Sequence, residues 1–193
     1  MKYLWILIYS TVLIWSGIEP KDQLTWFLEV FPAIAGGILL LLTMRSFPLT
    51  PLLYFLILAH CVILMVGGHY TYAEVPLFDD LWGMERNNYD KVGHFAQGFI
   101  PAILAREILI RKQVVKNTAW LNLFIVSVCL AFSAFYELIE WWVALLSGED
   151  AEAFLGTQGY VWDTQSDMAL ALTGAICAIL LLSRIHNRQL LKI

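Results

Sequence analysis

The sequence predicts an all-α polytopic membrane protein with about six transmembrane helices, and three observations support this fold class. First, 60% of the residues are hydrophobic and 15% are charged, whereas a soluble domain averages about 45–50% apolar and about 25% charged residues. Second, the mean hydropathy of the chain is +0.69. Third, apolar runs alternate with short polar segments along all 193 residues. We therefore expect a single transmembrane helical domain over residues 1–193.

Each apolar run approaches the length of about 20 residues that a helix needs to cross a bilayer. The runs end at helix breakers such as Pro20, Pro48 and Gly68. The first run resembles a signal peptide, but the segment after it, SGIEPKD, has no A-x-A-like cleavage site, so we interpret the run as a retained helix. The predicted helices are Tyr3–Ile18, Trp26–Met44, Leu52–Gly68, Val92–Ile110, Ala119–Leu146 and Met168–Ser183.

The distribution of basic residues predicts the orientation, because cytoplasmic loops of membrane proteins carry an excess of Lys and Arg. If the N-terminus is cytoplasmic, nine of the 12 Lys and Arg residues lie on the cytoplasmic side. The other three, Lys21, Arg86 and Lys91, lie in outer segments that also carry most of the acidic residues. Adding or removing one helix would destroy this separation. We therefore expect both termini in the cytoplasm.

Predicted helices four, five and six bring ionisable residues to one depth near the outer face. The fourth helix begins in YDKVGHFAQG, the fifth presents YELIEWW after a long apolar run, and the sixth follows VWDTQSDM. Ionisable residues within transmembrane helices are costly, usually face the interior of the bundle and often mark function. The predicted site contains His94 and Glu137 as catalytic residues and Asp90, Glu140, Asp163 and Asp167 as metal ligands.

Several carboxylates in a small volume repel one another unless some are protonated or a cation lies among them. A site of mostly oxygen ligands with one imidazole favours a divalent cation such as Mg²⁺ or Mn²⁺ over Zn²⁺. Without a metal, His94 and Glu137 could serve as a general acid/base pair. The sequence leaves the choice of cofactor open.

Structural roles also account for some of these residues taken singly. Thr164 and Asp167 match a T-x-x-D capping box ahead of an apolar run. Asp90 lies where an acidic residue stabilises a helix N-terminus. Glu140, which precedes two tryptophans, could lie in the headgroup region.

Other polar residues are expected to have structural roles. His60, in the middle of the third predicted helix, is expected to form a hydrogen bond with a neighbour. Arg106 and Glu107 are expected to be paired or to extend toward the interface. Outer-loop His69 and Glu74 could join the site from above, but the sequence does not place them.

Two further patterns concern the backbone. The segment LGTQGYVWD at 155–163 predicts a tight turn, because it lacks the Lys-Ser/Thr ending and the preceding strand of a phosphate-binding loop. Small residues at helical spacing indicate close approach between helices, and these are Gly98 with Ala102 and Gly174 with Ala178.

The segments YDKVGHFAQGF, YELIEWW and FLGTQGYVWDTQSDM together resemble the bacterial inner-membrane family typified by YjdF, whose function is unknown. The resemblance covers most of the chain and is most specific over residues 89–175. It implies a multi-pass protein of the bacterial inner (plasma) membrane.

A fainter resemblance is to VanZ-like proteins, which carry a D-K-x-x-H-F segment and later acidic residues and are associated with glycopeptide resistance and the cell envelope. Asp90, His94 and Phe95 match that segment together with Lys91. Glu137 or Glu140 and Asp167 are the counterparts of the later acids. The second Glu and the G-T-Q-G turn depart from the VanZ-like pattern.

Three functions fit these features. The first is metal-assisted hydrolysis or group transfer on a lipid or cell-envelope precursor. The alternatives are a proton- or cation-linked transporter, which is disfavoured because no inverted repeat or broken helix is visible, and a non-catalytic membrane scaffold. The expected partners are the lipid bilayer and a lipid or envelope substrate. Nucleic acid is not expected, because the 12 basic residues form no long run, and the oligomeric state is left open.

Overall fold

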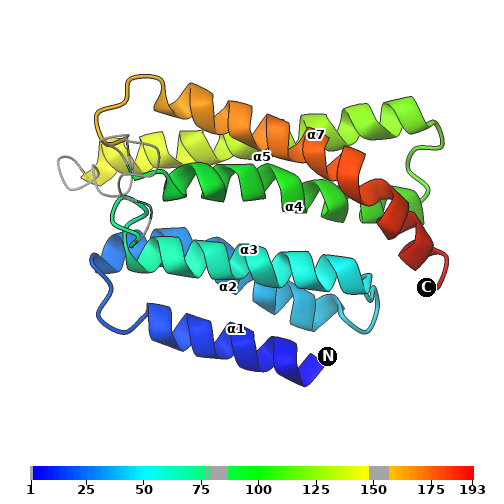
Figure 1. Cartoon of the computed structure of the whole chain (residues 1–193), viewed down its shortest axis with the longest axis horizontal. Helices are drawn as coiled ribbons and strands as arrows, with labels where there is room; N and C mark the ends of the chain where they lie inside the picture. Colours follow the sequence, from blue (N-terminus) through cyan, green and yellow to red (C-terminus); the bar gives the residue numbers. More distant parts are fainter. Residues whose placement is uncertain (1, 77, 79–86, 148–156) are drawn as a thin grey trace. The chain divides into compact units, whose positions relative to one another are not determined.

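A computed structural model describes residues 2–76, 78, 87–147 and 157–193, and within these residues the chain forms six α-helices (Figure 1). The all-α prediction is therefore confirmed. Arg86, which we assigned to an outer segment, and Leu155 and Gly156 of the predicted turn lie outside the described residues. The helices are α1 (Lys2–Ser16), α2 (Gln23–Thr43), α3 (Pro51–His69), α4 (Tyr89–Arg111), α5 (Thr118–Ser147) and α7 (Asp163–Leu190).

The predicted boundaries of the first five helices differ from the observed ones by at most three residues. The sixth prediction, Met168–Ser183, is too short, because α7 begins at Asp163 and ends at Leu190. The prediction followed the apolar residues, whereas the polar segments at both ends of α7 are also helical. As a consequence, Asp163 and Asp167 both lie inside a helix.

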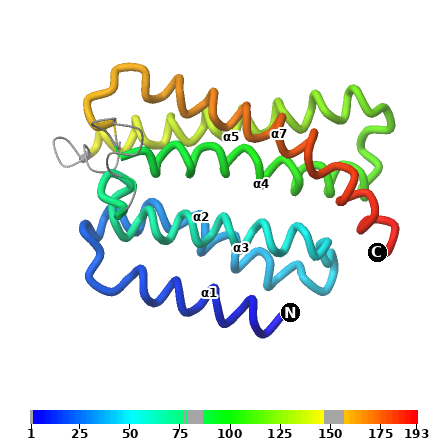
Figure 2. The backbone as a smooth tube through the Cα atoms, in the orientation of Figure 1, coloured from blue at the N-terminus to red at the C-terminus, as the bar shows by residue number. Residues whose placement is uncertain are grey.

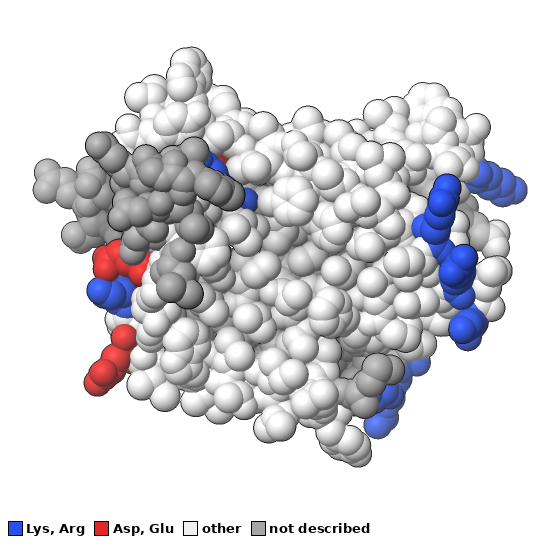
Figure 3. Space-filling view, in the orientation of Figure 1, with Lys and Arg blue, Asp and Glu red and all other residues white. Residues whose placement is uncertain are grey.

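Four of the helices, α2, α3, α5 and α7, are long and apolar enough to cross a membrane. Helix α1 has 15 residues and measures about 22 Å, which is less than the hydrocarbon thickness of about 30 Å. Helix α4 has 23 residues, enough to span, but it carries charged residues at both ends. On the face drawn in Figure 3, the coloured Lys, Arg, Asp and Glu side chains lie at helix ends and the lengths between them are white.

The helices pack as two compact units, and the single-domain organisation stays a prediction. Unit 1 comprises Met1–Phe47, Leu58–Gly93 and Ile139–Val161. Unit 2 comprises Pro48–Ile57, His94–Leu138 and Trp162–Ile193.

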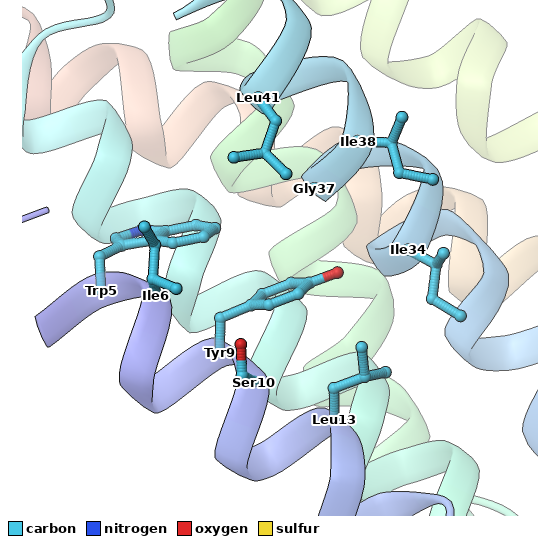
Figure 4. A pocket seen from close by; sticks show the side chains of 9 residues that line it. All are labelled: Trp5, Ile6, Tyr9, Ser10, Leu13, Ile34, Gly37, Ile38 and Leu41. Carbon is cyan, nitrogen blue, oxygen red and sulfur yellow. The ribbon is translucent and has the colours of Figure 1, made fainter. Parts of the chain in front are cut away.

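In unit 1, α1 and α2 run antiparallel (Figure 2) and are joined through Tyr9. Its hydroxyl donates a 3.0 Å hydrogen bond to the carbonyl oxygen of Ala33. Gly37 leaves room for this ring, because a Cβ there would lie 2.6 Å from the Tyr9 hydroxyl. A mostly apolar pocket of about 210 Å³ lies between α1 and α2 (Figure 4) and contains none of the predicted site residues.

In unit 2, α4 and α7 are in backbone contact. A Cβ on Gly98 would overlap the backbone of Ala171, and a Cβ on Gly174 would overlap the backbone of Phe95. Small residues allow two transmembrane helices to approach this closely. The predicted close approach at Gly98 and Gly174 is therefore confirmed, and it sets the spacing between α4 and α7.

Candidate functional site

His94 lies at the centre of a buried polar cluster in unit 2. Its Nδ1 atom is 3.9 Å from Glu137 Oε1 on α5, and its Nε2 atom is 3.9 Å from Asp167 Oδ2 on α7. The three residues are only 8%, 8% and 3% exposed, in the order His94, Glu137, Asp167. Three of the six predicted site residues therefore meet, one from each of three helices.

The contact between α4 and α7 explains why His94 and Asp167 lie close together. Gly98 follows His94 by one helical turn, and Ala171 follows Asp167 by one turn. Because Gly98 touches the backbone of Ala171, the turns that carry the imidazole and the carboxylate are held beside each other. The contact at Gly98 thus positions the site one turn away.

Gln97 lies beside the imidazole of His94, with its Oε1 atom 3.1 Å from His94 Nδ1. The other ring nitrogen, Nε2, faces Asp167. Both 3.9 Å separations from the carboxylates exceed hydrogen-bond length.

Asp163 is also buried, with 6% exposure, and as the first residue of α7 it shares one helix face with Asp167, four residues later. The capping-box interpretation of Thr164 and Asp167 is wrong. Helix α7 is capped at Trp162 without a side-chain hydrogen bond, so Thr164 lies within the helix. Capping therefore does not account for Asp167.

Asp90 and Glu140 are grouped with unit 1. Each lies about one helical turn along the chain from a residue of the cluster. Asp90 lies in the first turn of α4, four residues before His94, as expected of an acid at a helix N-terminus. Glu140 follows Glu137 by three residues on α5, which places the two on one face. Each is 9% exposed, so the headgroup interpretation of Glu140 does not agree with its burial.

The start of α4 is held by the predicted turn. Gln158 and Gly159 have φ values of 47° and 79°, which confirms a tight turn. The backbone N–H of Asn87 donates to Gln158 Oε1 at 2.9 Å, and Gln158 Nε2 donates to the Asn87 carbonyl at 3.1 Å. These two hydrogen bonds fix the turn beside Asn87, two residues before the start of α4.

His69 and Glu74 are engaged elsewhere in unit 1. His69 Nδ1 donates to the carbonyl oxygen of Ser16 at 3.0 Å. Glu74 forms a 2.7 Å ion pair with Lys21, and its hydrogen bond raises the pKa of the Lys21 ammonium group. His60 was expected to be hydrogen-bonded, but its Nε2 atom has no partner among the described residues, so that expectation is wrong.

A second buried cluster, which sequence reasoning missed, joins α4 and α7 at their C-terminal ends. The Glu107 carboxylate is fully buried and accepts hydrogen bonds from Thr50 Oγ1 at 2.7 Å, Arg111 at 2.9 Å and His186 Nε2 at 3.0 Å. Arg106 donates to His186 Nδ1 at 2.9 Å, so His186 bridges a cation and an anion. Arg106 and Glu107 are each paired, as expected, but with other residues: Arg106 with His186 and Asn187, and Glu107 with Thr50, Arg111 and His186. Extension toward the interface is not observed, because both are buried.

One signal in the sequence could have indicated His186. It follows Ala178 by eight residues, and Ala171, Ala175 and Ala178 are all fully buried on α7. Helical periodicity therefore places His186 on the buried face. We refer to Thr50, Arg106, Glu107, Arg111 and His186 as the Glu107 cluster.

The described parts of the chain form helices of mostly apolar surface with ionisable side chains buried among them, and these define a polytopic helical membrane protein. The chain matches the family described as "Predicted membrane protein (DUF2238)" over residues 1–188 and belongs to it. It is 54% identical to the "Inner membrane protein YjdF" of Escherichia coli (strain K12) over 184 residues, covering 94% of this chain and 88% of that protein. No solved structure matches the chain significantly.

These comparisons confirm the resemblance to the YjdF family and the localisation in the bacterial inner membrane. Contact with the lipid bilayer follows from that localisation. The fainter VanZ-like resemblance stays a prediction.

Proposed function

We propose that this protein is a cation-dependent enzyme that hydrolyses, or transfers a group of, a lipid or cell-envelope precursor. The observation that supports the proposal is the buried His94 imidazole, which has a carboxylate from a different helix 3.9 Å from each ring nitrogen. Buried ionisable groups that converge from separate transmembrane helices are typical of functional sites.

The donor atoms on the Nε2 side of His94 suit a divalent cation. Metal–oxygen and metal–nitrogen bonds of about 2.1 Å span up to about 4.2 Å between two ligands, so one ion fits between Nε2 and Asp167 Oδ2 at 3.9 Å. Gln97, bonded to Nδ1, acts as the outer hydrogen-bond partner that orients a metal-binding histidine. Asp163, one turn before Asp167 on α7, supplies a further oxygen ligand.

Glu137, on the other side of the ring, is the proposed general base. Its carboxylate accepts a proton from an attacking water or hydroxyl group. A cation bound at His94 and Asp167 would polarise a phosphoryl or carbonyl oxygen of the substrate. The preference for oxygen ligands favours Mg²⁺ or Mn²⁺.

We further propose that all six helices span the membrane, with both termini cytoplasmic and the His94 cluster near the outer face. Burial of Asp90, His94, Arg106 and Glu107 removes the polar groups of α4 from lipid, which makes a spanning α4 compatible with its low hydropathy. Labelling of single cysteines introduced at Lys116 and Gln158 tests this topology. Membrane-impermeant reagent added outside should modify only the cysteine at 158.

The enzymatic proposal is tested with purified protein in nanodiscs. Mn²⁺ binding is measured by electron paramagnetic resonance, and turnover by mass spectrometry of an inner-membrane lipid extract. His94→Ala and Asp167→Asn should abolish cation binding, whereas Glu137→Gln should retain binding and lose turnover. Glu74→Gln makes the same carboxylate-to-amide change at the exposed Lys21 ion pair and should match the unmodified protein.

Absence of Mn²⁺ binding at millimolar concentration, together with an unchanged lipid profile, would refute the enzymatic proposal. Neutral behaviour of all three site variants would instead support a membrane scaffold. A transporter remains the second candidate, because buried ionisable clusters lie at both ends of α4 and α7, about 20 Å apart by helix rise. Cation-dependent proton flux into proteoliposomes would support it.

A further inference from the structure

The C-terminal half of α7, orange to red in Figure 1, carries a row of exposed side chains at four-residue spacing. Residues four apart on a helix form one ridge along its surface. The first two residues of this ridge are apolar and the other three are basic. We refer to it as the α7 ridge, and its members are Ile176, Leu180, Arg184, Arg188 and Lys192.

The buried side of α7 fixes the direction in which the basic part of the ridge points. His186 is fully buried and is bonded to Arg106 and Glu107 of α4. Arg184 and Arg188 lie two residues before and after His186. Because each residue turns the helix by about 100°, both arginines point away from α4 and from the interior of unit 2.

The three basic side chains of the α7 ridge have no anionic partner in the described parts of the chain. None of them forms an ion pair or a side-chain hydrogen bond there. The acidic residues of unit 2 are Glu107, Glu137, Asp163 and Asp167. Glu107 is fully buried and already bonded, and Asp167 precedes Arg184 by 17 residues of α7, or about 25 Å of helix. The positive charge of the ridge is therefore left for a partner outside unit 2.

The ridge changes from apolar to basic at the depth where lipid does. Helix α7 has 28 residues and measures about 42 Å, about 12 Å more than the hydrocarbon thickness of about 30 Å. Counted from Asp163, about 30 Å of helix ends near Ser183. Leu180, which is 75% exposed, thus lies at the depth of acyl chains, and Arg184 lies at the depth of headgroups.

Two general effects account for only part of this pattern. Basic residues are favourable near a helix C-terminus, but the effect falls off within the last turn, which includes Arg188 and not Arg184. The excess of Lys and Arg in cytoplasmic segments concerns their number. It does not require them to share one helix face or to continue an exposed apolar row.

We propose that the α7 ridge binds an anionic phospholipid, whose phosphate contacts Arg184 and Arg188 and whose acyl chain lies along Leu180 and Ile176. Guanidinium groups suit phosphate because they donate two parallel hydrogen bonds, and Lys192 adds attraction to the anionic headgroup surface. The exposed apolar residues favour a lipid over free phosphate or an acidic soluble protein. The inference uses no residue of the His94 cluster and no cation, so it goes beyond the proposed function and does not depend on it.

The test measures which lipids the protein retains when it is released from nanodiscs of equal phosphatidylglycerol and phosphatidylcholine, by native mass spectrometry. The unmodified protein should retain phosphatidylglycerol in excess. Arg184→Gln and Arg188→Gln should each lower the ratio of the two retained lipids about fivefold, the effect of one basic residue near an anionic surface, and the double variant should lower it further.

Lys116→Gln is the matched control, because Lys116 is exposed, belongs to unit 2 and lies off the ridge, between α4 and α5. It should leave the ratio unchanged. All variants should keep the far-ultraviolet circular dichroism of the unmodified protein, since the replaced side chains bond to no described residue.

Three results would overturn the inference. Equal retention of both lipids by the unmodified protein would show that the ridge does not select an anionic lipid. An equal loss in Lys116→Gln and Arg184→Gln would assign the preference to the overall positive charge of this end. Displacement of phosphatidylglycerol by inorganic phosphate, beyond that by sodium chloride at the same ionic strength, would indicate a site for a free anion.

Discussion

Replacing Glu107 with alanine is expected to destabilise the protein more than any other single change in the Glu107 cluster. The carboxylate accepts hydrogen bonds from the Thr50 N–H and hydroxyl, from Arg111 and from His186. Hydrogen bonds inside membrane proteins average about 0.6 kcal/mol each, so four contribute about 2.4 kcal/mol. Removing the anion from a buried charge network costs about 3–5 kcal/mol in total, because the Arg106 guanidinium, which is 6% exposed and is joined to Glu107 through His186, stays buried. We therefore expect Glu107→Ala to lower the free energy of unfolding by about 3–5 kcal/mol.

The measurement is unfolding in mixed micelles titrated with sodium dodecyl sulfate, followed by far-ultraviolet circular dichroism. Thr50→Val removes one side-chain donor and should cost only about 1 kcal/mol, and Glu107→Gln should lie between the two. Glu74→Gln, at the exposed ion pair, should be near neutral. If Glu107→Ala and Thr50→Val lose the same stability, the carboxylate does not organise the cluster and the reasoning is wrong.

Three further predictions use the same unfolding assay. Gly98→Ala should lower the free energy of unfolding by about 1–3 kcal/mol through overpacking and should also weaken Mn²⁺ binding. Gly36→Ala, whose Cβ meets nothing within 4 Å, should be neutral or stabilising. Equal effects of the two substitutions would contradict the backbone contact at Gly98. Asp22→Ala should lower the free energy of unfolding by about 1 kcal/mol at pH 7, because Asp22 caps α2 by accepting a hydrogen bond from the Thr25 N–H. Asp22→Asn should retain most of the stabilisation by this cap. That same hydrogen bond lowers the pKa of Asp22. The unmodified protein should therefore exceed Asp22→Ala in free energy of unfolding above the usual pKa of a carboxyl group, and this difference should disappear as the pH falls through the lowered pKa. A difference that does not depend on pH would refute the cap. Tyr9→Phe should cost about 0.6–1 kcal/mol by removing the bond to Ala33, and no loss would mean that α1 is held by packing alone.

Hydropathy and helix breakers were sufficient to predict the first five helices, because the length of an apolar run is set by the bilayer itself. They were insufficient for α7, whose terminal turns are polar and still helical. The helix starts at Asp163 after Trp162, which occupies the N-cap position without a side-chain hydrogen bond, so no capping motif marks this start in the sequence. This is why a capping role for Asp167 was plausible from the sequence and wrong in the structure.

The convergence of His94, Glu137 and Asp167 was predictable from topology, because antiparallel order brings the start of α4, the end of α5 and the start of α7 together. The distances between them were not, since they depend on the contact of Gly98 with Ala171. The Glu107 cluster was missed because Thr50 and His186 are separated by most of the chain. Their pairing with Glu107 depends on the rotation of each helix about its own axis.

The contact between α4 and α7 has a mechanical consequence. Helices α4 and α7 touch backbone to backbone and are joined at their far ends by Glu107 and His186. We therefore expect them to move as one rigid body, which keeps the distance between His94 and Asp167 unchanged. If the proposed site takes a substrate, the change in spacing needed to admit it would fall to α5, which carries Glu137, and not to α4 or α7.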